Sequence, residues 1–284
     1  MPTLAHLLAE ARPRLAATSF GAPPREAALL LGWLLGLSEA QVLAHGEREV
    51  PAETAKRFRS LLERRLTGEP VAYLLGEREF YGRPFAVDPR VLIPRPETEH
   101  VVEEALAITL PERPWILDVG TGSGILPVTL ALEIPAARTV GTDISPGALA
   151  VARGNARRHG VGDRARFVGA DLVHGLDLSR FDLVVSNPPY IDAGDAPSLS
   201  PEVVDFEPHV ALFAPGAGDG GDSVLARLFS LLGVGLRPGI RAIVEIGFGQ
   251  IEAARRHAEA SGLHFAGARL DYAGIPRVVV LERR

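Results

Sequence analysis

The sequence contains no cysteine and only one lysine, Lys56. Without cysteine the chain can form no disulfide and has no thiolate nucleophile, and nothing argues for secretion. Aromatic residues make up only 6% of the chain, and no uncharged apolar run has the length of a membrane-spanning helix. The N-terminus also lacks the basic and then apolar order of a signal peptide. We therefore expect a cytoplasmic protein with no membrane partner.

The chain is slightly acidic. It has 30 basic and 35 acidic residues, which gives a formal net charge of -5. This balance argues against wrapping of bulk nucleic acid by a strongly basic surface, so no direct nucleic-acid partner is expected. The 8 histidines are scattered, and none forms the H-x-x-x-H pair of a helical metal site. We predict no metal.

The chain divides into regions of different composition. Residues 1–75 are rich in Ala, Leu, Arg and Glu, and the helical periodicity of 23–37 and 52–68 predicts a small helical domain. Residues 76–96 contain two short segments separated by Gly82-Arg83-Pro84, a pattern typical of a β-hairpin within a linker. Residues 97–284 follow as the predicted catalytic domain.

Strands and helices alternate in this last region. Alternation of this kind predicts an α/β fold with a mainly parallel sheet that is covered by helices on both faces. The last two strands are expected to pair antiparallel. The seven predicted strands span 115–120, 138–144, 165–171, 181–187, 240–247, 264–271 and 276–283.

A glycine-rich loop follows the first of these strands. It reads Asp118-Val119-Gly120-Thr121-Gly122-Ser123-Gly124, with glycine at alternate positions. Such a loop lies at the carboxyl edge of a parallel sheet, where ligands bind. Its spacing is not the G-x-G-x-x-G of a dinucleotide site, and the G-K-[ST] ending of a phosphate-binding loop is absent. Phosphate is therefore not favoured as the ligand.

Two carboxylates refine the choice of ligand. Asp118 lies at the mouth of the loop, where it would repel phosphate and attract an ammonium group. Asp143, at the end of the next strand, suits the two hydroxyls of a ribose. A ligand with a ribose, an amino group and no phosphate describes S-adenosyl-L-methionine. The alternative is that the glycines only turn the chain. Asp171, after the third strand, is either an adenine-side contact or a helix cap.

The fourth strand ends in the motif Asn187-Pro188-Pro189-Tyr190. The prolines lack an N–H and cannot continue the sheet ladder. The Asn187 side-chain oxygen and the Pro188 carbonyl can each accept one hydrogen of an NH₂ group, and Tyr190 can pack on its flat face. The alternative is that this segment is only a rigid turn.

This acceptor arrangement suits methyl transfer to an amide or aromatic amino nitrogen. The lone pair of such a nitrogen is delocalised, so the nitrogen is a poor nucleophile. Two acceptors would anchor it and favour a more tetrahedral geometry, which orients the lone pair and stabilises the positive charge that grows on nitrogen. No strong general base is required, because the methylated nitrogen becomes acidic.

Together these motifs resemble those of the glutamine methyltransferases of peptide chain release factors, the PrmC/HemK family. The combination of RPETE with NPPY is specific, whereas NPPY alone also occurs in enzymes that methylate adenine in DNA and RNA. The resemblance covers the chain from about Leu66 to its end, and its matching stretches are LTGEPVAYLLGEREFYG, VDPRVLIPRPETE, LDVGTGSGI, DISPGALAVARGNA, SNPPYI, EPHVALFAPGAGDGGDS, EIGFGQ and DYAGIPRVVV.

The resemblance implies a class I, Rossmann-like methyltransferase fold. It implies S-adenosyl-L-methionine as donor, S-adenosyl-L-homocysteine as product, and the Gln of the Gly-Gly-Gln motif of class 1 release factors as acceptor. Asn187, Pro188, Pro189 and Tyr190 would bind this substrate, and Asn187, Pro188 and Tyr190 would be catalytic. The expected donor site consists of Asp118, Gly120, Thr121, Gly122, Ser123, Gly124, Asp143, Asp171, Leu172 and Asn187.

Some assignments stay open. Position 172 is often aromatic in such enzymes, and Leu172 would lose any stacking on adenine. Phe80, in the hairpin segment, is expected to cover the cleft. The RPETE segment, with Arg95, Glu97 and Glu99, is either a charged lid or a helix start with acidic residues at its positive end.

Glu245 is interpreted as a buried strand-end carboxylate with a structural role. The helices of residues 1–75 are a hypothetical docking module for the protein partner, since they lie outside the catalytic fold. A monomer is the default expectation.

Three other functions compete with this one. The first is N6-adenine methylation of nucleic acid, which predicts a basic face and base-stacking aromatics. The second is glutamine methylation of a ribosomal protein, which only the family resemblance disfavours. The third is a non-catalytic protein that binds S-adenosyl-L-methionine, which predicts a damaged acceptor motif, whereas NPPY is intact here.

Overall fold

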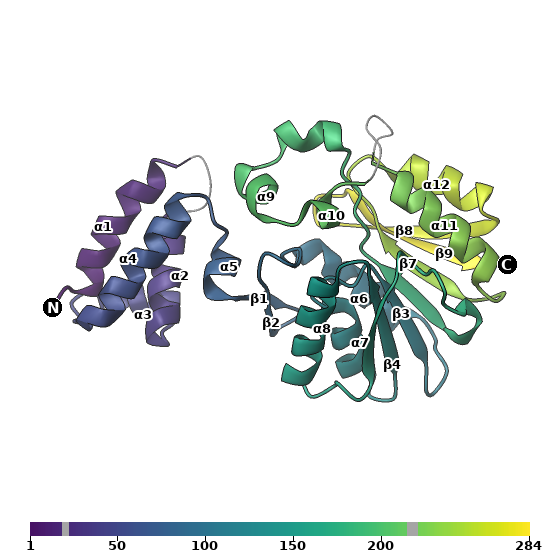
Figure 1. Ribbon diagram of the computed structural model, residues 1–284, viewed down its shortest axis with the longest axis horizontal. Coiled ribbons are helices and arrows are strands. Elements are labelled where there is room, and N and C mark those ends of the chain that lie inside the picture. Colours follow the sequence, from purple (N-terminus) through teal and green to yellow (C-terminus); the bar gives the residue numbers. More distant parts are fainter. Residues whose placement is uncertain (19–22, 215–220) are drawn as a thin grey trace. The chain divides into compact units, whose positions relative to one another are not determined.

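The computed structural model describes residues 1–18, 23–214 and 221–284, which form two compact units (Figure 1). One unit consists of Met1–Glu77 together with Leu199–Phe206, and the other of Arg78–Ser198 and Glu207–Arg284. The quoted stretch EPHVALFAPGAGDGGDS lies partly outside the described residues, at 215–220.

The first unit is helical and has its own core of leucine and other apolar side chains. Arg65 is fully buried there, where its guanidinium pairs with Glu26 at 2.9 Å and with Glu202 at 2.9 Å. Because Glu202 belongs to α9, this ion pair attaches a segment that is distant in sequence. The helices of the unit are α1 (Leu4–Ala16), α2 (Pro23–Leu35), α3 (Glu39–Ala44), α4 (Ala52–Leu66), α5 (Val71–Leu75) and α9 (Pro201–Phe206).

The second unit is built on a seven-stranded sheet in the order β5-β4-β3-β6-β7-β9-β8. Neighbouring strands from β5 to β7 run parallel, and β9 is antiparallel to both β7 and β8. The predicted fold class is thus confirmed, including the antiparallel pair at the end of the chain. The strands are β3 (Trp115–Val119), β4 (Arg138–Asp143), β5 (Ala165–Gly169), β6 (Leu183–Ser186), β7 (Arg241–Glu245), β8 (Leu263–Leu270) and β9 (Pro276–Arg283).

Both faces of the sheet are buried, which explains the continuous apolar runs of the central strands. Ile116 and Val185 belong to the core beneath one set of helices, whereas Leu117 and Val184 belong to the core beneath the other. In Figure 1 the two sets lie on opposite faces of the sheet. The first set is α6 (Glu99–Ala107), α7 (Ile125–Glu133) and α8 (Pro146–Arg158), and the second is α11 (Ser223–Gly235) and α12 (Ile251–Ala260). Shorter elements are α10 (His209–Leu212), η1 (Pro96–Thr98), η2 (Leu178–Arg180) and η3 (Ala193–Ser198).

A separate two-stranded sheet, β1 (Glu77–Phe80) and β2 (Arg83–Ala86), forms the hairpin. The expectation that Phe80 covers the cleft is wrong. Its ring is 1% exposed and packs edge-on against Phe85 in the core of the second unit, away from the pocket described below. Burial of a whole aromatic ring is strongly stabilising, which keeps it in the core.

The sheet order also determines where a ligand can bind. The chain leaves β3 for β4 on one side and returns to β6 on the other, so a crevice opens at the carboxyl end of β3. The loops after β3, β4 and β6 all reach this edge. Within the described residues, no helix is long and apolar enough to cross a membrane.

Candidate active site

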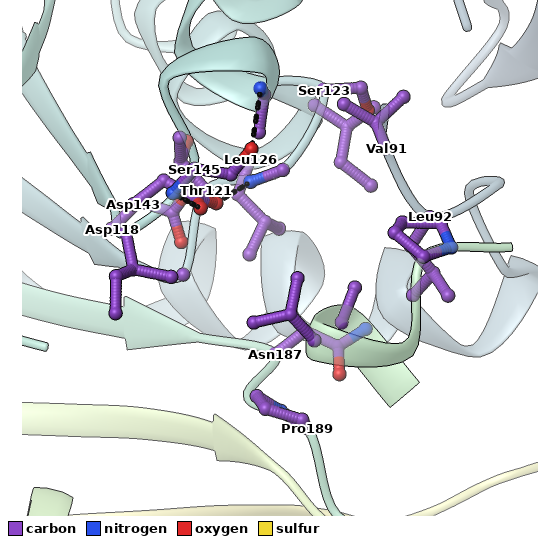
Figure 2. Close-up of a pocket in the computed structure, with 18 of the residues that line it drawn as sticks. Val91, Leu92, Asp118, Thr121, Ser123, Leu126, Asp143, Ser145, Asn187 and Pro189 are labelled. Carbon is purple, nitrogen blue, oxygen red and sulfur yellow. Dashed lines mark hydrogen bonds between the residues drawn. The ribbon is translucent and has the colours of Figure 1, made fainter. Parts of the chain in front are cut away.

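A pocket lies at this edge of the sheet (Figure 2). Three of its walls are the glycine loop after β3, the turn after β4 that contains Asp143, and Asn187 with Pro189 after β6. Figure 2 shows Asn187 and Pro189 across the pocket from Thr121, Asp143 and Ser145. Val91 and Leu92, from the segment that follows the hairpin, form a further wall.

The glycine loop adopts a backbone conformation that other residues disfavour. Gly120, Gly122 and Gly124 have φ of 74°, 52° and 80°. A Cβ at Gly124 would also lie 2.9 Å from the Cβ of Ala152 in α8, so the close approach of loop and helix requires glycine there. These features let the loop turn sharply into α7 and leave its backbone open to the pocket.

Asp143 ties this loop to the next turn. Its two carboxylate oxygens accept hydrogen bonds from the backbone N–H of Gly122 at 2.9 Å and of Ser145 at 2.8 Å. Each carboxylate oxygen has a second lone pair, so the side chain still has acceptor capacity toward the pocket. This arrangement fits the hydroxyls of a ribose.

Asp118 lines the pocket but is only 1% exposed. Neither of its carboxylate oxygens accepts a hydrogen bond from a described residue. Burial raises the pKa of Asp118 to about 7, because the Thr121 hydroxyl beside it offsets the loss of water only in part and Asp143 adds repulsion. A buried carboxylate without partners needs a cation or donor, so the site fits the ammonium group of S-adenosyl-L-methionine.

Asp171 and Leu172 also reach the pocket. Of the two roles considered for Asp171, helix capping does not occur, because the chain continues there as a turn. Its carboxylate instead pairs with Arg227 of α11 at 2.6 Å. Leu172 has a φ of 54°, which is unusual for a branched side chain and marks a constrained position.

The four residues of the acceptor motif separate into two pairs. Asn187 and Pro189 line the pocket, whereas Pro188 is buried beneath it and Tyr190 lies outside the lining. The Asn187 side-chain Nδ2 donates a hydrogen bond of 3.0 Å to the Thr98 hydroxyl. Because the amide nitrogen is engaged, the amide oxygen is left as the polar atom that can receive a substrate hydrogen.

Family models match both parts of the chain. A PrmC N-terminal domain model matches residues 6–76, and a methyltransferase small domain model matches residues 102–204. A release factor glutamine methyltransferase from Koribacter versatilis is 39% identical over 98% of both chains. One from Moorella thermoacetica is 42% identical over 99% of both chains. The chain belongs to the release factor glutamine methyltransferase family.

Solved structures of more distant proteins share the fold of this release factor glutamine methyltransferase family member. The catalytic domain of hMettl16, solved with an RNA hairpin, gives a TM-score of 0.55 at 16% identity over 82% of each chain. A methyltransferase from Pyrococcus furiosus gives 0.54 at 16% identity, over 78% of this chain and 96% of the other. At this identity the likeness concerns the fold alone.

In this family member the RPETE segment is a helix start. Pro96–Thr98 form one turn of 3-10 helix and α6 begins at Glu99. The Glu99 carboxylate accepts a hydrogen bond of 2.9 Å from the Tyr81 backbone, which holds the hairpin. Arg95 differs, because it lines the pocket and pairs at 2.5 Å with Glu207. Of Arg95, Glu97 and Glu99, only Arg95 therefore borders the pocket.

Several side chains outside the predicted site support the pocket of this release factor glutamine methyltransferase family member. Glu207 is buried and holds both Arg95 and the Ile93 backbone N–H, at 3.0 Å, so it shapes the pocket wall. Thr98 and Gln250 contact the acceptor motif from distant segments. The only signal for them was their presence in the quoted stretches, and a threonine before a helix is normally interpreted as a cap.

Across residues 1–18, 23–214 and 221–284, no group of three or more His, Asp or Glu side chains could hold a metal ion. The expectation that this family member needs no metal stays a prediction.

Proposed function

We propose that this chain transfers a methyl group from S-adenosyl-L-methionine to the side-chain amide nitrogen of the Gln in the Gly-Gly-Gln motif of class 1 peptide chain release factors. The observation that carries the proposal is the orientation of the Asn187 amide. Its nitrogen is held by Thr98, so an oxygen is presented where an NH₂ group must be received. Membership of the release factor glutamine methyltransferase family supports the choice of protein.

The donor contributes a methyl group on a positively charged sulfur. Asp143 would hold the ribose of that donor and Asp118 its ammonium group. The open backbone of the glycine loop would let the donor approach closely. Asp171 and Leu172 are proposed to border the adenine, and Thr121 and Ser123 to complete the loop. All of these residues bind and orient, and none is assigned a covalent role.

Asn187 and Pro188 act on the acceptor. The Asn187 Oδ1 and the Pro188 carbonyl each accept one amide hydrogen, and the anchored nitrogen directs its lone pair at the methyl carbon. The new N–C bond forms from that lone pair as the C–S bond breaks, and the bonding electrons stay with sulfur. The nitrogen, briefly cationic and stabilised by both acceptors, then releases one proton to water. Pro189 borders the pocket, and Tyr190, which lies outside the lining, is proposed to support this loop and to reach the flat face of the amide when the substrate is bound.

The proposal is tested by transfer of labelled methyl from S-adenosyl-L-methionine. The acceptors are a bacterial release factor, its variant with Gln replaced by Ala in the Gly-Gly-Gln motif, a ribosomal protein fraction, and unmethylated DNA and RNA. We expect label on the release factor alone and none on the variant. Label on nucleic acid or on a ribosomal protein would replace the proposed acceptor, and no label on any acceptor would overturn the enzymatic proposal.

The helical unit is proposed to dock the release factor. Its support is a compact core of its own and two large apolar side chains that stay exposed, Trp33 at 41% and Leu43 at 55%. Replacement of both by Ala should raise KM for the intact release factor and leave kcat unchanged. An unchanged KM would place docking elsewhere. We further propose a monomer that acts in the cytoplasm, where termination occurs, and sedimentation at assay concentration checks the monomer.

A further inference from the structure

Glu245 is a buried carboxylate that the proposed reaction does not use. It ends β7, is 2% exposed and does not line the pocket. The strand β7 lies directly beside β6, with Val244 opposite Ser186, so Glu245 lies next to the start of the acceptor motif. Its Oε2 accepts no hydrogen bond from any described residue. Burial of such a group is costly, so its position needs a physical explanation.

Two polar contacts connect Glu245 with the acceptor motif. The Tyr190 hydroxyl donates to Glu245 Oε1 over a long 3.4 Å. On the other side the Thr98 hydroxyl interacts with the carboxyl and lowers its pKa, against the larger effect of burial. That same hydroxyl accepts the hydrogen bond from the Asn187 amide nitrogen. Glu245 therefore contacts Tyr190 directly and interacts with Thr98, which in turn holds Asn187.

Thr98 is the last residue of the 3-10 turn η1 and directly precedes α6, and its side chain makes no cap hydrogen bond. It is fully buried, and its hydroxyl faces Asn187 instead. A hydroxyl that accepts from Asn187 keeps one hydrogen to donate, and this hydroxyl interacts with the carboxyl of Glu245.

The segment after Glu245 holds the rest of the loop. Gln250 Nε2 donates a hydrogen bond of 3.0 Å to the Tyr190 carbonyl, and Gln250 Oε1 accepts from the Gly247 N–H at 2.8 Å. A Cβ at Gly247 would lie 2.9 Å from the Tyr190 ring, so this glycine makes room for the ring. The stretch EIGFGQ thus contacts Tyr190 at its hydroxyl, its ring and its carbonyl.

We propose that Thr98 is a positioning residue that, with Glu245 beside the motif, keeps the amide oxygen of Asn187 turned toward the acceptor site. The terminal torsion of an asparagine is broad, so an unrestrained amide would also present its NH₂. Two NH₂ groups would then meet, with no acceptor between them. The inference rests on the proposed function, because it assumes an NH₂ substrate.

The orientation can be measured apart from activity. The sequence has two asparagines, Asn155 and Asn187, so selective ¹⁵N-asparagine labelling yields two side-chain NH₂ groups. Asn155 is the internal reference, since its nitrogen donates to the Ala86 and Ser123 carbonyls. In Thr98→Val and Glu245→Gln we expect the Asn187 NH₂ resonances to move and their exchange with water to accelerate, while those of Asn155 stay in place.

Activity is measured in the same proteins with the release factor as acceptor. Thr98→Val should lower the single-turnover rate of methyl transfer about 10- to 100-fold, with the affinity for S-adenosyl-L-methionine within about twofold of the parent. Thr98→Ser, which keeps the hydroxyl, should restore most of the rate. The rate of Glu245→Gln should lie between the rates of Thr98→Val and Thr98→Ser. Thr139→Val is the matched control, because Thr139 is an equally buried threonine whose hydroxyl donates to the Pro127 carbonyl at 3.1 Å.

The outcomes separate the two proposals. A parent that methylates no release factor overturns the proposed function and this inference together. A parent that is active, with Thr98→Val and Glu245→Gln as fast as Thr139→Val, leaves the function intact and overturns the positioning role. Loss of rate with unmoved Asn187 resonances overturns it as well. If Thr98→Val does not fold, Glu245→Gln and Thr98→Ser decide by the same two measurements.

Discussion

The glycine loop after β3 and the acceptor loop after β6 border one pocket but are held in different ways. The glycine loop turns through its own backbone, with the Gly124 N–H bonded to the Thr121 carbonyl at 2.8 Å, and the side chains that bond to it, Asp143 and Asn155, lie 21 and 32 positions from their partners. The acceptor loop makes its side-chain contacts with Thr98, Glu245 and Gln250, which are 55 to 89 positions away in the chain.

The difference follows from what each loop must do. A loop that offers backbone atoms to a ligand needs only a special conformation, and glycine supplies it locally. A loop that offers one oriented side chain must restrain rotation about that side chain, and only packed partners can do so. Next to each loop lies one buried carboxyl, Asp118 on the donor side of the pocket and Glu245 on the acceptor side. Burial raises the pKa of each to about 7.

The largest effect is expected from Asn187→Ala, which removes the acceptor oxygen. Loss of one such oriented group lowers kcat about 100-fold or more. Affinity for S-adenosyl-L-methionine, measured by calorimetry, should change by only a few-fold, because the glycine loop is intact. A large loss of donor affinity would show that the two sides are not independent.

The pH dependence of stability tests the acceptor side. Burial, with a smaller contribution from Glu97, raises the pKa of Glu245 to about 7, although Thr98, Tyr190 and Arg277 lower it in part. The folded form thus holds the proton more tightly than the unfolded chain. That stabilisation is fully present below about pH 4.5 and is lost as the pH rises through about 7, by about 3 kcal/mol at most.

Glu245→Gln should not show this loss. As the pH rises, its free energy of unfolding should therefore increase relative to that of the parent. Denaturant titrations between about pH 4.5 and about pH 8 measure it. Asp118→Asn is the donor-side counterpart, with the same sign. A constant difference between Glu245→Gln and the parent would mean that Glu245 titrates normally.

Substitution in the glycine loop separates strain from crowding. Gly122→Ala has free space for its Cβ but a φ of 52°, so only backbone strain of about 1–3 kcal/mol is expected. Gly124→Ala adds the contact with Ala152 and should cost more free energy of unfolding. Both should weaken donor binding. Equal costs for the two variants would contradict the close approach of loop and helix.

Donor affinity should itself depend on pH through Asp118. Burial raises the pKa of Asp118 to about 7, so the carboxylate that would pair with the donor ammonium forms only as the pH rises through that value. We expect affinity to increase about tenfold across this range, as for a charge-assisted hydrogen bond. Asp118→Asn should bind with constant, low affinity. A flat profile in the parent would remove Asp118 from the donor site.

The smallest effect is expected at Leu172. Replacement by Phe would restore an aromatic face beside the proposed adenine position and should tighten donor binding about threefold, in the range of one ring contact. Calorimetry with Leu172→Ala as the opposite control measures it. Unchanged affinity in both variants would mean that this side chain does not contact the donor.

Most of the fold could be predicted from the sequence. The alternation of apolar runs with amphipathic segments identified seven strands and the antiparallel pair at the end of the chain, and the sheet has this arrangement. Phe80 was misplaced for a physical reason. An aromatic residue in a hairpin can face a cleft or a core, and only the packing of α6 and Phe85 against it decides.

The sequence by itself determined which chemical groups are available for binding the donor and the acceptor. Alternate glycines, the carboxylates at the ends of two strands and the NPPY motif are local patterns, because backbone dihedrals and strand ends depend on neighbours in the chain. Only the tertiary structure decided what restrains Asn187. The pairing of β7 with β6 brings Glu245 beside Tyr190, and the start of α6 brings Thr98 to the amide. Such contacts join segments that no local pattern links, so they appear only once the sheet is assembled.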